Sequence, residues 1–99
     1  MSYGVLIDIP ASAEFYAAAH AEFSKYPTEA LILHVAWPAE NGHQVVEVWQ
    51  SKEDYERWTG AHVGAVMGAL AAAGWTLPEP AITEFTPLGI VVPAAEISA

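Results

Sequence analysis

The chain has 99 residues, of which 54% are hydrophobic, with no cysteine and a formal net charge of -9. This length predicts a single domain spanning residues 1–99, because domains usually run to about 100 to 150 residues. The lack of cysteine excludes disulfides, thiolate nucleophiles and thiolate zinc sites. Because the negative charge repels phosphate groups, neither a nucleic acid nor an anionic membrane surface is an expected partner.

The sequence also predicts the location of the protein and its oligomeric state. No apolar run reaches the roughly 18 to 20 residues that a membrane-spanning helix needs. The N-terminus lacks the basic start of a signal peptide, so a cytoplasmic protein is expected. A chain this short buries only about 60 to 65% of the surface that its unfolded form exposes. We therefore expect a homodimer, which would cover the remaining apolar surface.

The first part of the chain predicts a strand, a helix and a second strand. Alternating β-branched residues predict a strand over 4–9. An apolar residue at every fourth position predicts a helix over 13–25 with one buried face. This helix ends at Tyr26-Pro27, because the residue before a proline disfavours the α conformation, and a largely buried strand follows over 30–37.

A hairpin turn is predicted at Asn41-Gly42. This dipeptide suits the positive φ angles at both central positions of a type I′ turn, and a strand over 43–50 follows it. Counting outward from a two-residue turn at these positions places His34 opposite Trp49.

The remainder of the chain predicts two helical segments and a last strand. Ser51 opens a sequence like a capping box, so a helix is expected to begin there. Gly60 is expected to divide that helix, and the second segment covers 61–73. The last strand covers about 82–92, and residues 93–99 are expected to be a loose tail or an arm that reaches a partner chain. The predicted element order is βαββααβ.

This order, together with residues 47–53 (EVWQSKE) and an aromatic helix that carries Tyr55 and Trp58, resembles the antibiotic biosynthesis monooxygenase-like group of dimeric α+β barrel proteins. The resemblance implies an α+β fold with a ferredoxin-like protomer and an antiparallel sheet. It also implies that two sheets pair into a dimeric barrel, and that each protomer has a pocket between its sheet and helices. Proteins of this kind include cofactor-free oxygenases, haem-degrading enzymes, isomerases and cyclases, as well as members without known activity.

A histidine and a carboxylate are the leading candidates for catalysis. Because strand side chains alternate, His34, Glu47 and Trp49 share one face of the predicted hairpin. The resemblance implies that Trp49 looks into the pocket, which brings the other two side chains with it. An imidazole beside a carboxylate can transfer a proton. The alternative is that the two groups only bond to each other, or to solvent, on a partly exposed sheet.

Several further side chains are candidates. His62 begins the segment after Gly60 and is a second possible catalytic base, whereas His43 lies beside the turn and is expected to be exposed. His34, Glu47 and His62 could form a metal-binding set, but no closely spaced metal motif supports one, so no metal or other cofactor is expected. Asp8 is a candidate because the first strand lies beside the third in a ferredoxin-like sheet, which would bring it towards Glu47. The expected ligand-binding residues are aromatic or polar: Trp49, Trp58, Tyr16, His20 and Asp8.

Three functions remain open from the sequence. The first is a cofactor-independent enzyme of monooxygenase, cyclase or isomerase type, which uses His/Glu proton transfer on a hydrophobic aromatic or polyketide-like small molecule. The second is a non-catalytic dimeric module that binds an apolar small molecule in the same pocket. The third is a dimer that serves as an interaction platform, in which case the interior would hold no cavity.

Overall fold

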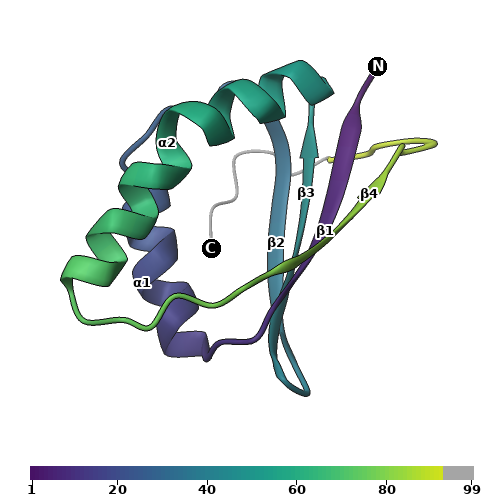
Figure 1. Cartoon of the computed structure of the whole chain (residues 1–99). Coiled ribbons are helices and arrows are strands. Elements are labelled where there is room, and N and C mark those ends of the chain that lie inside the picture. The colour runs from purple at the N-terminus through teal and green to yellow at the C-terminus, as the bar shows by residue number, and fades with distance from the viewer. Residues whose placement is uncertain (93–99) are drawn as a thin grey trace.

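A computed structural model describes residues 1–92 and shows two layers, a four-stranded sheet and a pair of helices on one of its faces (Figure 1). The sheet order is β2-β3-β1-β4, and every neighbouring pair of strands is antiparallel. The elements in chain order are β1 (Tyr3–Ile9), α1 (Ala13–Phe23), β2 (Leu31–Ala39), β3 (Gly42–Trp49), α2 (Lys52–Ala72) and β4 (Ala81–Phe85). This confirms the predicted α+β class with an antiparallel sheet, and the predicted tail or arm at 93–99 lies outside the described residues.

Both helices begin at a serine that caps the first turn. The Ser12 hydroxyl accepts a hydrogen bond from the backbone N-H of Phe15 at 3.1 Å. The Ser51 hydroxyl accepts from the backbone N-H of Asp54 at 3.0 Å, so the predicted start of the second helix is confirmed. Such caps satisfy N-H groups that have no partner inside the helix.

The helix pair packs through a small apolar core near the end of α2. Phe15, Val66 and Leu70 are each less than 5% exposed and form this core, with Trp75 packed against its edge. The ring of Trp75 meets that of Phe15 edge to face, with centroids 5.6 Å apart. None of the helices in the described part of the chain is both long and apolar enough to span a membrane.

Two predicted boundaries are wrong. Gly60 does not divide the second helix, which runs unbroken from Lys52 to Ala72. A helical glycine costs only about 1 kcal/mol relative to alanine, and the packing of Val66 and Leu70 further along the helix outweighs that cost. The last strand ends at Phe85 rather than at residue 92, before Pro87, which has no N-H to give to a strand ladder.

The hairpin turn differs from the prediction by one residue. Ala39 pairs with Gly42, so the two turn residues are Glu40 and Asn41, and Asn41 does not have the positive φ of a type I′ turn. Gly42 has φ +146° and lies against the β1-α1 connection. A Cβ atom there would lie 2.7 Å from the backbone nitrogen of Ala11 and closer still to the carbonyl oxygen of Ile9. Tertiary contact with that connection therefore requires this glycine at the start of β3.

The strand register changes with the turn. His34 lies directly opposite Glu47, whereas the prediction placed it opposite Trp49. The shift amounts to two residues, and side chains alternate with a period of two. The three side chains therefore share the helix-facing side of the sheet, as expected, although their predicted pairing is wrong.

A substitution at Gly42 tests the close approach of β3 to the β1-α1 connection. We expect Gly42→Ala to lower the free energy of unfolding by at least about 1 to 3 kcal/mol, because alanine strains the positive φ and its Cβ meets backbone atoms. Urea unfolding followed by circular dichroism measures this loss.

Gly68→Ala is the matched control. Gly68 is exposed on α2 and a Cβ there would meet nothing within 4 Å, so this variant should gain about 0.5 to 1 kcal/mol. Equal stability of the two variants would contradict the close approach.

Candidate functional site

A cavity of about 380 Å³ lies between the helix-facing side of the sheet and the two helices. Small-molecule sites usually have volumes of about 300 to 1,000 Å³ and mostly apolar walls with a few polar groups. The walls here follow that pattern, and among the described lining residues Glu47 is the only Asp, Glu, Lys or Arg. The lining side chains are Ile7, Ile9, Phe15, Tyr16, Ala19, His20, Phe23, His34, His43, Val45, Glu47, Tyr55, Trp58, Thr59, Val63, Val66, Met67, Pro78, Pro80 and Ile82.

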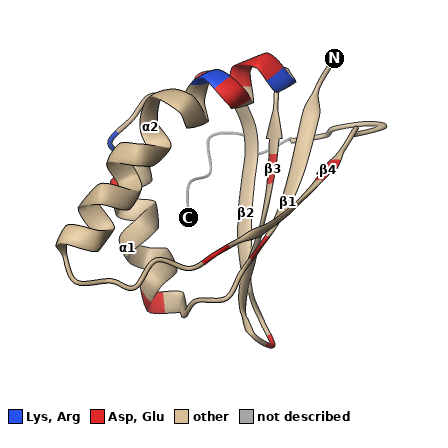
Figure 2. Cartoon of the chain, in the orientation of Figure 1, with Lys and Arg blue, Asp and Glu red and all other residues tan. Residues whose placement is uncertain are grey.

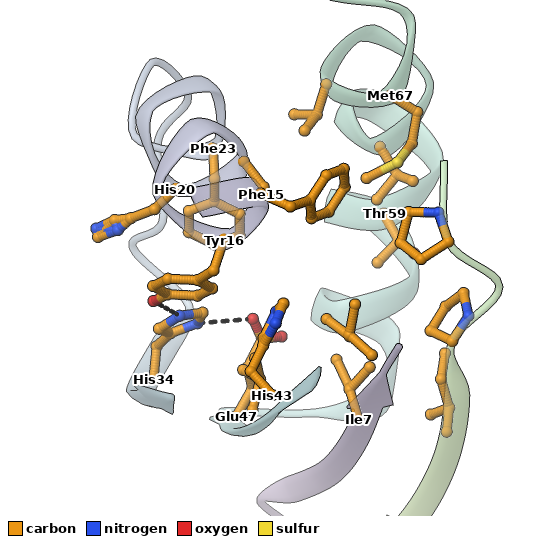
Figure 3. Close-up of a pocket in the computed structure, with 18 of the residues that line it drawn as sticks. Ile7, Phe15, Tyr16, His20, Phe23, His34, His43, Glu47, Thr59 and Met67 are labelled. Carbon is orange, nitrogen blue, oxygen red and sulfur yellow. Dashed lines mark hydrogen bonds and ion pairs between the residues drawn. The ribbon is translucent and has the colours of Figure 1, made fainter. Parts of the chain in front are cut away.

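A chain of hydrogen bonds crosses one wall of the cavity (Figure 3). The Tyr16 hydroxyl is 2.8 Å from Nε2 of His34, and Nδ1 of His34 is 2.9 Å from Oε2 of Glu47. A carboxylate can only accept, so His34 donates from Nδ1 and its Nε2 is left as an acceptor for the Tyr16 hydroxyl. The structure thus joins the predicted His34 and Glu47 pair and adds a phenol to it.

Glu47 is buried, with 9% of its side chain exposed. Burying a carboxylate is costly unless hydrogen bonds or a counter-charge compensate it. The indole N-H of Trp49 donates to Oε1 at 3.1 Å while His34 donates to Oε2, so both oxygens have a donor. The three basic side chains of the protein lie elsewhere, at the start of α2 and in the α1-β2 connection (Figure 2).

Three elements position this chain of groups. Residues 43, 45, 47 and 49 of β3 alternate onto the helix-facing side, and cross-strand pairing sets His34 of β2 beside Glu47. Tyr16 lies in the second turn of α1, whose start the Ser12 cap fixes. The ring of Tyr16 lies nearly parallel to that of His34, with an interplanar angle of 22°.

The environment of Tyr16 favours its protonated form. Burial raises the pKa of the Tyr16 hydroxyl above its ordinary value of 10.0, and the negative charge of Glu47 raises it further. Tyr16 therefore carries its proton at neutral pH and can donate it to His34.

His43 was expected to be exposed, and that prediction is wrong. The residue is 5% exposed and lines the cavity, because the β1-α1 connection lies across it. Its Nδ1 lies 2.9 Å from the carbonyl oxygen of Ala11. Its Nε2 is buried and has no hydrogen-bond partner among residues 1–92. Leaving such a group unsatisfied costs about 1 to 3 kcal/mol.

The predicted tryptophans have different positions. Trp58 lines the cavity, and its indole N-H donates to the carbonyl oxygen of Pro27 at 2.7 Å. The prediction that Trp49 lines the cavity is wrong. Trp49 is 1% exposed and packs near Tyr55 and Trp58. Its contribution is the hydrogen bond to Glu47, one step behind the wall.

Of the two predicted helix histidines, only one lines the cavity. His20 lines the cavity beside Tyr16, with ring centroids 5.7 Å apart. His62, predicted as a possible base, does not line it; its ring stacks on Tyr26 at 4.6 Å and meets Trp58 at 5.1 Å. The three-residue metal set is therefore not assembled, and the described residues hold no group of three His, Cys, Asp or Glu side chains arranged for a metal.

Asp8 lies on the other face of the sheet, so its predicted approach to Glu47 is wrong. Asp8 pairs with Gln44 and accepts a hydrogen bond from its amide, whereas Glu47 pairs with Val5. β1 does lie beside β3, as a ferredoxin-like sheet requires. The parity along β1 turns Asp8 away from the helices.

Sequence reasoning missed other lining residues. His43 could have been found, because it has the same strand parity as Glu47. Pro78, Pro80 and Ile82, from the α2-β4 connection and β4, also line the cavity. No local pattern predicts that this segment runs from the end of α2 across to the sheet (Figure 1). Tyr55 lies in the first turns of α2, where an aromatic face was expected.

No protein-family model and no curated protein matches the sequence. Solved structures do match the fold. A Chloroflexus aurantiacus protein assigned to the antibiotic biosynthesis monooxygenases has a TM-score of 0.64 at 19% identity, over 93% of this chain and 98% of that one. SnoaB of Streptomyces nogalater, a cofactor-independent oxygenase, has a TM-score of 0.62 at 18% identity, over 91% of this chain and 96% of its own.

A third structure, of a Deinococcus radiodurans protein with the same family assignment, has a TM-score of 0.59 at 18% identity, over 93% of this chain and 97% of that one. Likeness at such low identity concerns the fold. The chain therefore has the fold of the antibiotic biosynthesis monooxygenase-like proteins, as its sequence resemblance implied.

The raised pKa of Tyr16 can be tested directly. The Glu47→Gln variant removes the negative charge and should lower the pKa of Tyr16. The pKa should stay above 10.0, because burial raises it more than the charge of Glu47 does. Carbon-13 NMR of labelled tyrosine ring carbons, followed against pH, measures it. A wild-type pKa at or below the ordinary value would contradict the described environment.

Proposed function

We propose that this protein is a small cofactor-independent enzyme of the monooxygenase type, which removes a proton from an apolar, aromatic or polyketide-like substrate. The observation that carries the proposal is the part-buried Tyr16, His34 and Glu47 chain in the wall of a mostly apolar cavity. The shared fold supports it, since SnoaB performs cofactor-independent oxygenation on such a scaffold. Active sites commonly combine a base with a group that orients it.

Proton removal follows the direction of the hydrogen bonds. The Tyr16 oxygen accepts the substrate proton while the Tyr16 hydroxyl proton passes to Nε2 of His34. The substrate becomes an anion and His34 an imidazolium, which Glu47 stabilises through Nδ1. Because Trp49 holds the other oxygen of Glu47, the carboxylate keeps its orientation during the transfer.

Oxygenation without a cofactor requires the substrate to supply the electrons. An anion formed at an activated CH₂ group is electron-rich and can react with dioxygen. The overall reaction R₂CH₂ + O₂ → R₂C=O + H₂O balances without an external reductant, since the CH₂ group loses both hydrogens and the second oxygen atom leaves as water. The protein contributes the base, a dry environment and orientation.

Anthrone is a suitable probe for this reaction, because one carbonyl and two aryl rings activate its CH₂ group. We expect the wild-type protein to speed anthrone-dependent oxygen uptake, with anthraquinone as the product. His34→Asn keeps an amide donor for Glu47 but lacks Nε2, and it should lower kcat by about 10² to 10⁴-fold, the usual contribution of a positioned base. Oxygen-electrode and absorbance assays measure both quantities.

Tyr16→Phe should show the same loss, since it removes the first proton acceptor. Tyr26→Phe is the matched control, because Tyr26 does not line the cavity and should retain the wild-type rate. Anthrone that binds without oxygen uptake above that of buffer would contradict the enzyme and support the binding module.

We also propose that the working form is a homodimer joined through the outer face of the sheet. The strand pairing and the pleat place apolar side chains on this face: Leu6, Leu33, Val35, Trp37, Val46, Val48 and Phe85. Three of them are well exposed in the single chain, Val35 at 43%, Phe85 at 38% and Trp37 at 37%. Exposed apolar patches of this kind mark association surfaces.

Val35→Glu tests this interface. Placing a charge among the apolar side chains of the outer face should convert a dimer to a monomer, as measured by light scattering at micromolar concentration. Leu77→Glu is the control, because Leu77 is 42% exposed but lies in the α2-β4 connection. A wild-type monomer mass would overturn the dimer without affecting the proposed chemistry.

A further inference from the structure

The Tyr16, His34 and Glu47 chain makes no use of His43, another polar group of the cavity wall. His43 is 5% exposed and lines the same cavity, four residues before Glu47 on β3 (Figure 3). Its Nδ1 lies 2.9 Å from the carbonyl oxygen of Ala11, and a carbonyl oxygen can only accept. Nδ1 therefore carries a ring proton, which leaves Nε2 as the acceptor, although its neighbours cover Nε2 almost completely.

No described neighbour supplies a donor to Nε2. The Tyr16 hydroxyl is used by His34, and the Thr59 hydroxyl donates to the backbone carbonyl of Glu56 at 3.2 Å. The ring of Tyr16 meets His43 edge to face at 5.2 Å. Buried polar groups in proteins almost always have hydrogen-bond partners. An unpaired acceptor in the wall of a cavity therefore suggests that a ligand supplies the donor.

We propose that His43 determines specificity: when a small turn of its ring opens Nε2 to the cavity, Nε2 accepts a hydrogen bond from a hydroxyl group of the ligand. The cavity then selects aromatic molecules that carry a hydroxyl on the edge nearest β3 over their ethers, which have no proton to donate. This inference rests on the proposed function for its substrate and adds a second anchoring point. Tyr16 and His34 receive the proton, and His43 holds the ring system in position.

A purely structural role for His43 makes a different prediction. Its bond to Ala11 ties the start of β3 to the β1-α1 connection and involves only Nδ1. Such a strut has no reason to discriminate between a hydroxyl and an ether, and Nε2 would not respond to a ligand.

Nitrogen-15 NMR of histidine-labelled protein separates the two roles. The probes are 1-naphthol and 1-methoxynaphthalene, which share a ring system and differ in the donor. In the free protein we expect His43 to be the Nδ1-H tautomer with an unprotonated Nε2. Saturation with 1-naphthol should shift the Nε2 resonance in the direction of an accepted hydrogen bond, and saturation with the ether should not.

The His43→Asn variant gives the matching affinity test. The asparagine amide can still donate to Ala11 but has no atom at the Nε2 position. By calorimetry, the preference of the protein for 1-naphthol over its ether should fall about 3- to 10-fold, the effect of one net hydrogen bond. His43→Gln places a polar atom near Nε2 and should recover part of the preference.

Three results would overturn the role of His43: an Nε2-H tautomer, an Nε2 resonance that does not move when 1-naphthol is bound, or no binding of 1-naphthol at millimolar concentration. Failure of the proposed catalysis gives a different pattern. If only the proton transfer is wrong, oxygen uptake is absent while the Nε2 shift persists. The shift should also persist in His34→Asn, which removes the base but leaves His43 in place.

Discussion

The buried carboxylate of Glu47 imposes the strictest requirement in this structure. With 9% of its side chain exposed, it must have donors on both oxygens. Trp49 and His34 provide them from two adjacent strands, and the second donor is what fixes the tautomer of His34. A fixed tautomer gives Nε2 its acceptor character and so sets the direction of the bond from Tyr16. The buried charge of Glu47 thereby determines the direction of both hydrogen bonds in the Tyr16, His34 and Glu47 chain.

The β1-α1 connection has an equally specific role on the other side of the cavity. It lies so close to Gly42 that no side chain fits there, and the carbonyl oxygen of Ala11 accepts a hydrogen bond from Nδ1 of His43. Both contacts fall at the start of β3, so the position of the hairpin turn and the orientation of the His43 ring depend on the same few backbone atoms. This explains why the turn obeys tertiary packing rather than the local preference of Asn41-Gly42.

The fold and half of the site could be predicted because their signals are local. Strand alternation put His34, Glu47 and Trp49 on one face, and the two-residue error in register did not change that parity. The misplaced residues depended on long-range contacts. His43 looked exposed because the covering connection is distant in sequence, and His62 looked like a site residue because Gly60 suggested a break that the packed helix does not have.

The distribution of polar groups also limits what the cavity can do. Most of the wall is apolar, and its polar atoms gather where β2, β3 and α1 meet. A ligand must therefore be apolar over most of its surface and polar at one edge. Because no lysine or arginine lines the cavity in the described part of the chain, the substrate anion of the proposed reaction would be balanced by the proton that arrives on His34. In the proposed reaction the anion and the imidazolium form together, and the reaction of the anion with dioxygen competes with return of the proton from His34.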